Sequence, residues 1–585
     1  MKRKHKSKPS IPPPTHRGSR ARAGGQTLRT WTVGAVPLVN QLLERIRLEE
    51  FLRQHLPKDG RRMAVPTSRC LLLLLRNVLL SREPIYGLGE WAERFAPDLL
   101  GLRDEDLDHL NDDRIGRSLD RLFQANVPCL VLDVVRHVVK EFDVSLDELH
   151  NDSTTISFYG AYESAQEEQK RGTKQRLAML LGHSKDHRPD LKQLLYILTV
   201  TEDGGVPIYF TAASGNVTDD TTHRETWDLL RQLTDRVDFL YVADSKLATR
   251  ENMQYIHNQG GRFITILPRT RREDREFRRR LAAAPDALAW EHLYDMLDDE
   301  QAVVDRLRVC AEPSLSSEGY RLLWYHSTRK AQRDGMSRTK AIERACRELA
   351  ELQSRLQGAR TRFRTRDKVE AAVAQVLCRG DVHRWVKVTI HEAPQEQFKQ
   401  ATRGRPGKET RYVKEVRVRY RLTWELETSQ IEEDEITDGV FPLVTNQHEM
   451  PAAEVLKAYK RQPLIEKRFS QFKSDFEVAP VYLKEVTRIQ SLLCIYFFAL
   501  MVQTLLEREL RGALEASGYD TIPLYPEHRD CSAPTTRRIL DIFDNVQRHT
   551  LSGGTGEPQM FVTQLSPLQR WIASWFDLSS RKYGR

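Results

Sequence analysis

Three acidic residues stand out by the kind of element on which each is expected to lie. Asp152 falls in a β-branched and aromatic stretch, Asp244 ends the apolar stretch DFLYVAD, and Glu466 lies on an amphipathic helical stretch. Carboxylates brought close together repel one another and raise each other's pKa. Mg²⁺ and Mn²⁺ are hard cations that prefer oxygen ligands and neutralise such a cluster. We therefore expect Asp152, Asp244 and Glu466 to form a metal site.

A site of this kind performs phosphoryl transfer. Two metal ions about 3.5–4 Å apart activate a water or a 3′-hydroxyl and stabilise the leaving oxygen of an in-line displacement. Acids alone are weak indicators, however, because 82 of the 585 residues are Asp or Glu. The elements that position the three residues therefore decide how much weight the prediction carries.

The order of elements after residue 148 predicts an α/β fold. HNDSTTISFYG is typical of a strand, and LLYILTVTEDGGVPIYFTAASG predicts an antiparallel hairpin that turns at residues 202–205. THRETWDLLRQLTDRV then predicts a helix, DFLYVAD a strand, residues 248–259 a helix and residues 262–268 a strand. A sheet that places its first and fourth strands side by side would bring Asp152 and Asp244 together.

The stretch that carries Glu466 reads YKRQPLIEKRFSQFK, from Tyr459 to Lys473. Pro463 disfavours a continuous helix through Gln462, because proline restricts the residue before it. Proline is tolerated in the first turn of a helix. The helix that bears Glu466 is therefore expected to restart at Pro463.

This stretch resembles the signature Y-x2-R-x3-E-x6-K of one group of insertion-sequence DDE transposases. Tyr459, Glu466 and Lys473 are in register, whereas the arginine position holds Gln462, so that Arg461 or Arg468 would substitute. Other stretches are similar to the same family and follow in the expected order over roughly residues 30–550: LHNDSTTISFYG, GHSKDHRPDLKQ, GNVTDDTT, YVADSKLAT and DGVFPLVTN.

The resemblance implies a ribonuclease H-like core with a mixed sheet and flanking helices, interrupted by an insertion. It implies that Asp152, Asp244 and Glu466 are catalytic and hold two Mg²⁺ ions, for which Mn²⁺ would substitute. It also implies binding of terminal inverted repeats, cleavage at transposon ends and strand transfer into target DNA. The partner would be double-stranded DNA, contacted by Tyr459, Arg461 and Lys473, and a homodimer is expected in the DNA complex.

A second candidate DNA contact comes from the stretch VKEVRVRYRLTW. Arg417, Arg419 and Arg421 alternate with apolar residues and so share one face of the predicted strand. A basic strand face suits a row of phosphates. The alternative is a solvated outer face of an antiparallel sheet, and the residues do not decide between the two.

Composition and patterning divide the chain into six segments. They are a disordered basic arm (1–26), a helical N-terminal DNA-binding or assembly domain (27–148), a first part of the core (149–268), a β-rich and helical insertion domain (269–437), a second part of the core with the glutamate helix (438–510) and a helical C-terminal region (511–585).

Net charge and cysteines exclude several classes of protein. Residues 1–25 carry eight Lys and Arg and no acid, so the other 560 residues account for only +1 of the net charge of +9. Seven cysteines without a C-x-x-C pair argue against a zinc module and against a disulfide scaffold. The apolar run Leu492–Val502 is shorter than a membrane span and predicts a buried helix. We expect a bacterial cytoplasmic, nucleoid-associated protein without a membrane segment.

Two other functions remain open at this stage. One is a catalytically silent relic of a transposase that binds DNA without cutting it, which the three intact acids disfavour. The other is a ribonuclease H-like nuclease that cuts DNA but does not join it, which the Tyr459, Glu466 and Lys473 signature disfavours.

Overall fold

The structure is a computed structural model of the 585-residue chain. It describes residues 20–578 apart from short gaps, at 24–25, 62, 161, 172–173, 183–184, 186–187, 189, 218–220, 299, 359–360, 477–482, 526, 528 and 554–557. Most of the predicted disordered arm (1–26) lies outside the described residues. Within it, Arg20–Ala23 forms strand β1.

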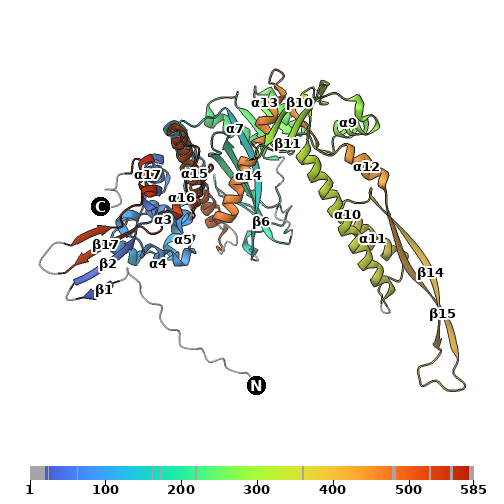
Figure 1. Cartoon of the computed structure of the whole chain (residues 1–585). Coiled ribbons are helices and arrows are strands. Elements are labelled where there is room, and N and C mark those ends of the chain that lie inside the picture. Colours follow the sequence, from blue (N-terminus) through green and yellow to red (C-terminus); the bar gives the residue numbers. More distant parts are fainter. Residues whose placement is uncertain are drawn as a thin grey trace. The chain divides into compact units, whose positions relative to one another are not determined.

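The chain divides into two compact units (Figure 1). Unit 1 comprises Met1–Ile264 and Lys457–Arg585, and unit 2 comprises Thr265–Leu456. The predicted insertion, 269–437, agrees with unit 2 at its start and falls 19 residues short of its end. The predicted N-terminal domain and C-terminal region belong to unit 1, as does the predicted core apart from residues 265–268 and 438–456.

Unit 1 begins with a helical region, as the sequence predicts. The Asn111 side chain accepts from the backbone N–H of Arg114 at 2.8 Å and so caps a helix, as expected for a residue of this type before an amphipathic stretch. The helices and short 3₁₀ turns are α1 (Val36–Ile46), α2 (Leu48–His55), α3 (Thr67–Leu80), η1 (Ile85–Gly87), α4 (Leu88–Ala92), η2 (Pro97–Leu100), η3 (Asp104–His109), α5 (Asp112–Gln124) and α6 (Val127–Glu141).

A small sheet joins the two ends of the chain. Strand β2 (Gln26–Thr32) pairs antiparallel with β17 (Gln547–Ser552), and the sheet order is β1-β2-β17-β18, with β18 at Gln559–Val562. The C-terminal region is therefore not purely helical, as the sequence analysis expected, although it also holds α16 (Thr536–Asp541) and α17 (Pro567–Trp575).

A mixed sheet forms the centre of unit 1, with the strand order β9-β8-β3-β6-β7. β3 pairs antiparallel with β6 and parallel with β8, and β6 pairs antiparallel with β7. The strands are β3 (Glu148–Phe158), β6 (Lys192–Thr201), β7 (Pro207–Ser214), β8 (Leu240–Ala243) and β9 (Arg262–Ile266), with helices α7 (His223–Thr234) and α8 (Arg250–Asn258) between the last three. Between β3 and β6 lie η4 (Glu163–Ala165) and the small pair β4 (Gln169–Arg171) and β5 (Lys174–Arg176). The predicted hairpin and the pairing of the first strand with the fourth are confirmed.

The long helix α15 (Val486–Ala516) fills the core of unit 1 and packs against α3 and α5. Among the described residues, α15 is the one unbroken helix that is long and apolar enough to cross a membrane. However, 94% of its most apolar stretch is buried inside the protein. Two further helices, α5 and α6, pass that test only as one span bent by 87°. The prediction of a buried helix around residues 492–502 is confirmed.

Unit 2 combines an antiparallel sheet, two long helices and a β-ribbon. The sheet order is β10-β11-β13-β16, with β12 on β13. The elements are α9 (Arg272–Ala283), η6 (Pro285–Ala287), β10 (Trp290–Leu297), β11 (Val303–Cys310), β12 (Ser314–Leu315), β13 (Arg321–Ser327), α10 (Thr328–Gln357), α11 (Arg366–Gly380), β14 (Val386–Gln400), β15 (Tyr412–Leu426), α12 (Thr428–Ile436) and β16 (Val440–Thr445). The stretch 440–445, which the sequence analysis assigned to the second part of the core, forms β16, pairs with β13 and falls within unit 2.

Candidate active site

The first two predicted acids lie side by side on neighbouring parallel strands. Asn151 of β3 is in register with Ala243, the last residue of β8. Asp152, the next residue of β3, therefore lies beside Asp244, which follows β8. Adjacent strands are about 4.8 Å apart. The charge of Asp244 raises the pKa of Asp152, which places the two carboxylates within electrostatic reach of each other.

Asp152 is largely buried and has a lysine as its counter-ion. Lys185 Nζ lies 3.3 Å from Asp152 Oδ1 and donates to the carbonyl and the hydroxyl of Ser153 at 2.6 and 2.8 Å. Burial raises the pKa of Asp152 to about 6, against the lowering effect of Lys185 and with a further increase from Asp244. The ionised form of Asp152 is therefore unfavourable in the folded protein when no cation is bound.

The charges of all three predicted acids act on Tyr459. It lies on α13 (Ala452–Lys460), and Glu466 lies, exposed, on α14 (Pro463–Ser470). Burial raises the pKa of Tyr459, and the charges of Asp244, Glu466 and Asp152 each raise it further. The negative charges of Asp152, Asp244 and Glu466 thus all disfavour ionisation of the half-buried Tyr459 hydroxyl. Pro463 is the first residue of α14, as predicted.

The side chains of the predicted acids offer carboxylate oxygens, which are the ligands that hard divalent cations prefer. The raised pKa of Asp152 shows that its negative charge is unfavourable without a bound cation. Among the residues that the structure describes, no group of three or more His, Cys, Asp or Glu side chains lies close enough to hold an ion. The structure therefore places Asp152 and Asp244 near each other but does not bring the three acids into a closed ligand shell.

Gln462, which replaces the signature arginine, points inward. Its Oε1 lies 3.0 Å from His150 Nδ1, and its Nε2 donates to the carbonyl of Asn151 at 3.3 Å. His150 Nε2 in turn lies 2.8 Å from Glu148 Oε1. Gln462 therefore ties the break between α13 and α14 to β3, the strand that carries Asp152.

We expect Gln462→Arg, which restores the residue type of the signature, to destabilise the protein by roughly 1–3 kcal/mol. The new guanidinium would be longer than the amide that it replaces and would bring a charge into the buried position beside His150. Denaturant unfolding measures the change. The same substitution at the exposed Gln332 of α10 is the control and should leave stability within about 0.5 kcal/mol; an equal loss at both positions would contradict this role of Gln462.

The two arginines proposed to replace the signature arginine both have partners inside the protein. Arg461 NH1 lies 2.6 Å from Glu148 and 3.3 Å from Glu202. Arg468 is 1% exposed and pairs with Glu507 at 3.1 Å, so it does not face solvent. Lys473 is half-buried in the π-helical turn η7 (Gln471–Asp475), which follows α14 directly.

The arginines of β15 belong to unit 2 and differ in their surroundings. Arg417 pairs with Glu415 at 3.2 Å, and Arg419 donates to the carbonyl of Gly358, beyond the end of α10, at 2.9 Å. Arg421 is exposed and lies opposite His391. Arg419 thus fastens β15 to α10, so the three do not form one free basic face.

Sequence reasoning missed Lys185, His150 and Glu148. Lys185 lies in the stretch GHSKDHRPDLKQ, which was noted only for its similarity, and 33 residues separate it from Asp152. Side chains two and four positions apart in a strand share one face, so the sequence could have predicted that His150 and Glu148 lie on the same face of β3 as Asp152. No local signal indicated that both residues meet the Gln462 segment.

The raised pKa of Asp152 predicts a pH-dependent effect of Asp152→Asn. Because the folded protein holds this proton more tightly than the unfolded chain, wild-type stability falls as pH rises from about 4 to 6. The variant avoids that cost and should be more stable above pH 6 by an amount of the order of 2 kcal/mol, with no gain at pH 4. Unfolding in EDTA at both pH values measures this.

Asp238→Asn is the control for that experiment. Arg236 lowers the pKa of Asp238, so its amide variant should gain no stability at high pH. A gain for Asp152→Asn that is the same at both pH values would refute the electrostatic cause.

Comparisons with known proteins add limited information. The family model DUF4277, described as a domain of unknown function, matches residues 28–135. No curated protein matches the chain. One similar solved structure is the piggyBac transposase synaptic complex with hairpin DNA, at 10% identity and a TM-score of 0.23; the match covers 51% of this chain and 59% of that chain. A TM-score this low does not indicate a shared fold.

Proposed function

We propose that this chain is a DDE transposase of an insertion sequence, with a ribonuclease H-like core and a metal-dependent active site at Asp152, Asp244 and Glu466. The observation that supports the proposal is the parallel pairing of β3, which carries Asp152, with β8, which Asp244 follows, together with the action of their charges and that of Glu466 on Tyr459. Asp244 and Glu466 are 222 positions apart in the sequence, and the charges of both act on Tyr459.

The strand order supports the ribonuclease H-like part of the proposal. The first three strands of the sheet, β3, β6 and β7, form an antiparallel meander, and β8 lies parallel to β3 on its other edge, followed by β9. This places the acid of the first strand and the acid after the fourth at one point of the sheet. Loop and helix insertions elsewhere leave that point intact.

The roles of the residues follow from their surroundings. Bound Mg²⁺ or Mn²⁺ would activate the attacking oxygen and stabilise the leaving oxygen of the phosphodiester. Asp152 and Asp244 would hold the cations, and Glu466 would supply a further oxygen. Lys185 offsets the charge of Asp152 in the protein alone. Tyr459 would orient the phosphate or the terminal nucleotide, and Lys473 would contact a phosphate.

A cleavage and joining assay tests the proposal. Purified protein is incubated with DNA fragments that carry the sequences flanking its coding region, with Mg²⁺, with Mn²⁺ or with EDTA. We expect strand cleavage at the inverted repeats in either metal and none in EDTA, and joining of pre-cut ends to a target plasmid. A gel shift without cleavage would favour the silent relic, and cleavage without joining would favour a nuclease.

A further inference from the structure

Unit 2 carries a long two-stranded ribbon that ends in a basic loop. β14 and β15 pair over their whole length, from Val386–Leu426 to Gln400–Tyr412 (Figure 1). The backbone N–H of Ala401 donates to the carbonyl of Arg411 at 2.9 Å, and Thr410 N–H donates to Gly407 at 3.1 Å, so the loop has a defined turn. We call residues 401–411 the ribbon tip.

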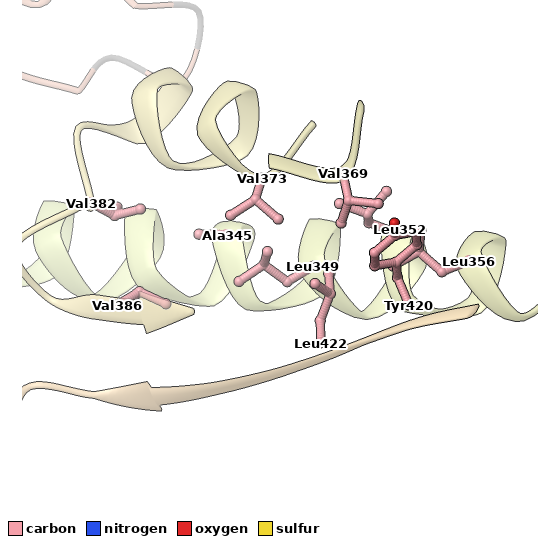
Figure 2. Packing of buried hydrophobic residues seen from close by; sticks show 10 residues of the cluster. All are labelled: Ala345, Leu349, Leu352, Leu356, Val369, Val373, Val382, Val386, Tyr420 and Leu422. Carbon is pink, nitrogen blue, oxygen red and sulfur yellow. The ribbon is translucent and has the colours of Figure 1, made fainter. Parts of the chain in front are cut away.

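Only the base of the ribbon is packed. Val386, Tyr420 and Leu422 lie in a hydrophobic cluster with Leu349 and Leu352 of α10, and α11 contributes Val369 and Val373 (Figure 2). This cluster also contains Ala345 and Leu356 of α10, so the apolar side of that helix packs within its own unit. The base thus fixes the direction in which the ribbon leaves the unit.

The distal half of the ribbon has no such support. Its apolar side chains are exposed: Phe398, Tyr412, Val413, Val416 and Val418 are between 39% and 64% accessible. A two-stranded hairpin by itself is only marginally stable in water. A ribbon of this length, kept out of the core, is suited to contact a partner.

Charge along the ribbon is uneven. On the strands, Lys399 pairs with Glu415, and Lys414 pairs with Glu396 at 2.5 Å. The tip has four basic residues and one acid, a net charge of +3 in eleven residues. Within the described part of the chain these four form no ion pair and all are exposed: Arg403, Arg405, Lys408 and Arg411. The positive excess is therefore free at the tip and balanced along the strands.

We propose that the ribbon tip is a minor-groove arm that binds A·T-rich duplex DNA through Arg403 and Arg405. The proposal rests on the proposed function only in taking duplex DNA as the partner. The tip reads Arg403-Gly404-Arg405-Pro406. Gly404, between the two arginines, has no side chain and so allows the backbone to approach the groove closely. Pro406 limits the conformations of the loop.

Groove dimensions favour this placement. A two-stranded ribbon fits the major groove, about 12 Å wide, but the faces of this ribbon are apolar or carry paired charges, so they offer little to phosphates. The minor groove, about 6 Å wide, excludes the ribbon and admits the side chains of its tip. A·T-rich tracts narrow that groove and concentrate its negative potential, which attracts arginine.

A binding experiment without metal tests the proposal. Fluorescence anisotropy in EDTA compares full-length wild type with Arg403→Ala/Arg405→Ala on labelled A·T-rich and G·C-rich duplexes of equal length. We expect the variant to lose roughly tenfold or more in affinity for the A·T-rich duplex and much less for the other. Arg329→Ala/Arg333→Ala, which removes two exposed arginines of α10, should lose similar small amounts on both duplexes.

A second measurement needs no variant. Netropsin, which occupies the minor groove of A·T tracts, should displace wild-type protein from the A·T-rich duplex. Equal losses of the tip variant on both duplexes, or unchanged binding as expected if the ribbon instead holds a second copy of the chain, would overturn the proposal. Because no cleavage is measured, failure of the transposase assay and failure of this one are separate results.

Discussion

Asp152→Asn, Asp244→Asn and Glu466→Gln are each expected to reduce metal-dependent cleavage of end DNA roughly a thousandfold or more. Each change keeps the size of the side chain but removes its negative charge and one acceptor oxygen. A neutral amide does not balance the charge of a bound divalent cation, so the attacking oxygen would remain unactivated. Initial cleavage rates in Mg²⁺ measure the effect.

Binding separates this loss from misfolding. All three variants should bind end DNA in EDTA within about threefold of wild type, because a few carboxylates contribute little to the phosphate contacts that dominate affinity. Glu251→Gln, an exposed acid on α8, should retain full cleavage. Wild-type rates in any of the three site variants would show that catalysis does not take place at this site.

The local features of the site were predictable from sequence. Pro463 both ended one helix and began the next, because the restriction that proline places on its neighbours acts within a few residues. The turn at residues 202–205 and the flanking apolar runs specified the β6–β7 hairpin, in which Gly204 and Gly205 adopt positive φ. The pairing of β3 with β8 followed from the order of elements rather than from any one residue.

The features that the sequence did not predict depend on residues far apart in the chain. Arg461 pairs with Glu148, which is 313 residues away, and no pattern near Arg461 indicates that partner. Strand β17 also has a distant partner, because it pairs with β2 near the other end of the chain. The C-terminal region, which was predicted to be helical, therefore contains both helices and strands. A side chain's partners, unlike its periodicity, are set by the folded arrangement.

Glu507 is a further residue of this kind, and Glu507→Ala is expected to destabilise unit 1 by about 3–5 kcal/mol. Glu507 of α15 is fully buried and accepts from Arg468 at 3.1 Å and from Gln471 at 2.9 Å. Burial by itself would raise the pKa of Glu507, but Arg468 and Lys467 hold it below its usual value. Without Glu507, the buried guanidinium of Arg468 would lose its counter-charge.

The loss should also reach the active site, because Arg468 lies two residues after Glu466 on α14 and donates to the carbonyls of Gly204 and Gly205 in the β6–β7 turn. Guanidinium chloride unfolding measures stability. Glu509→Ala on the same helix removes a partly exposed partner of Arg45 and should cost only about 1 kcal/mol or less.

The double variant Arg468→Met/Glu507→Leu distinguishes a lost charge pair from a lost volume. Replacing a buried ion pair by apolar side chains of similar size is often neutral or stabilising, so the double variant should recover most of the stability that Glu507→Ala loses. It should not recover cleavage to the same extent, since methionine does not bond to the turn carbonyls that Arg468 holds. If stability and cleavage returned together, the Arg468–Glu507 pair would serve folding alone and not the placement of Glu466.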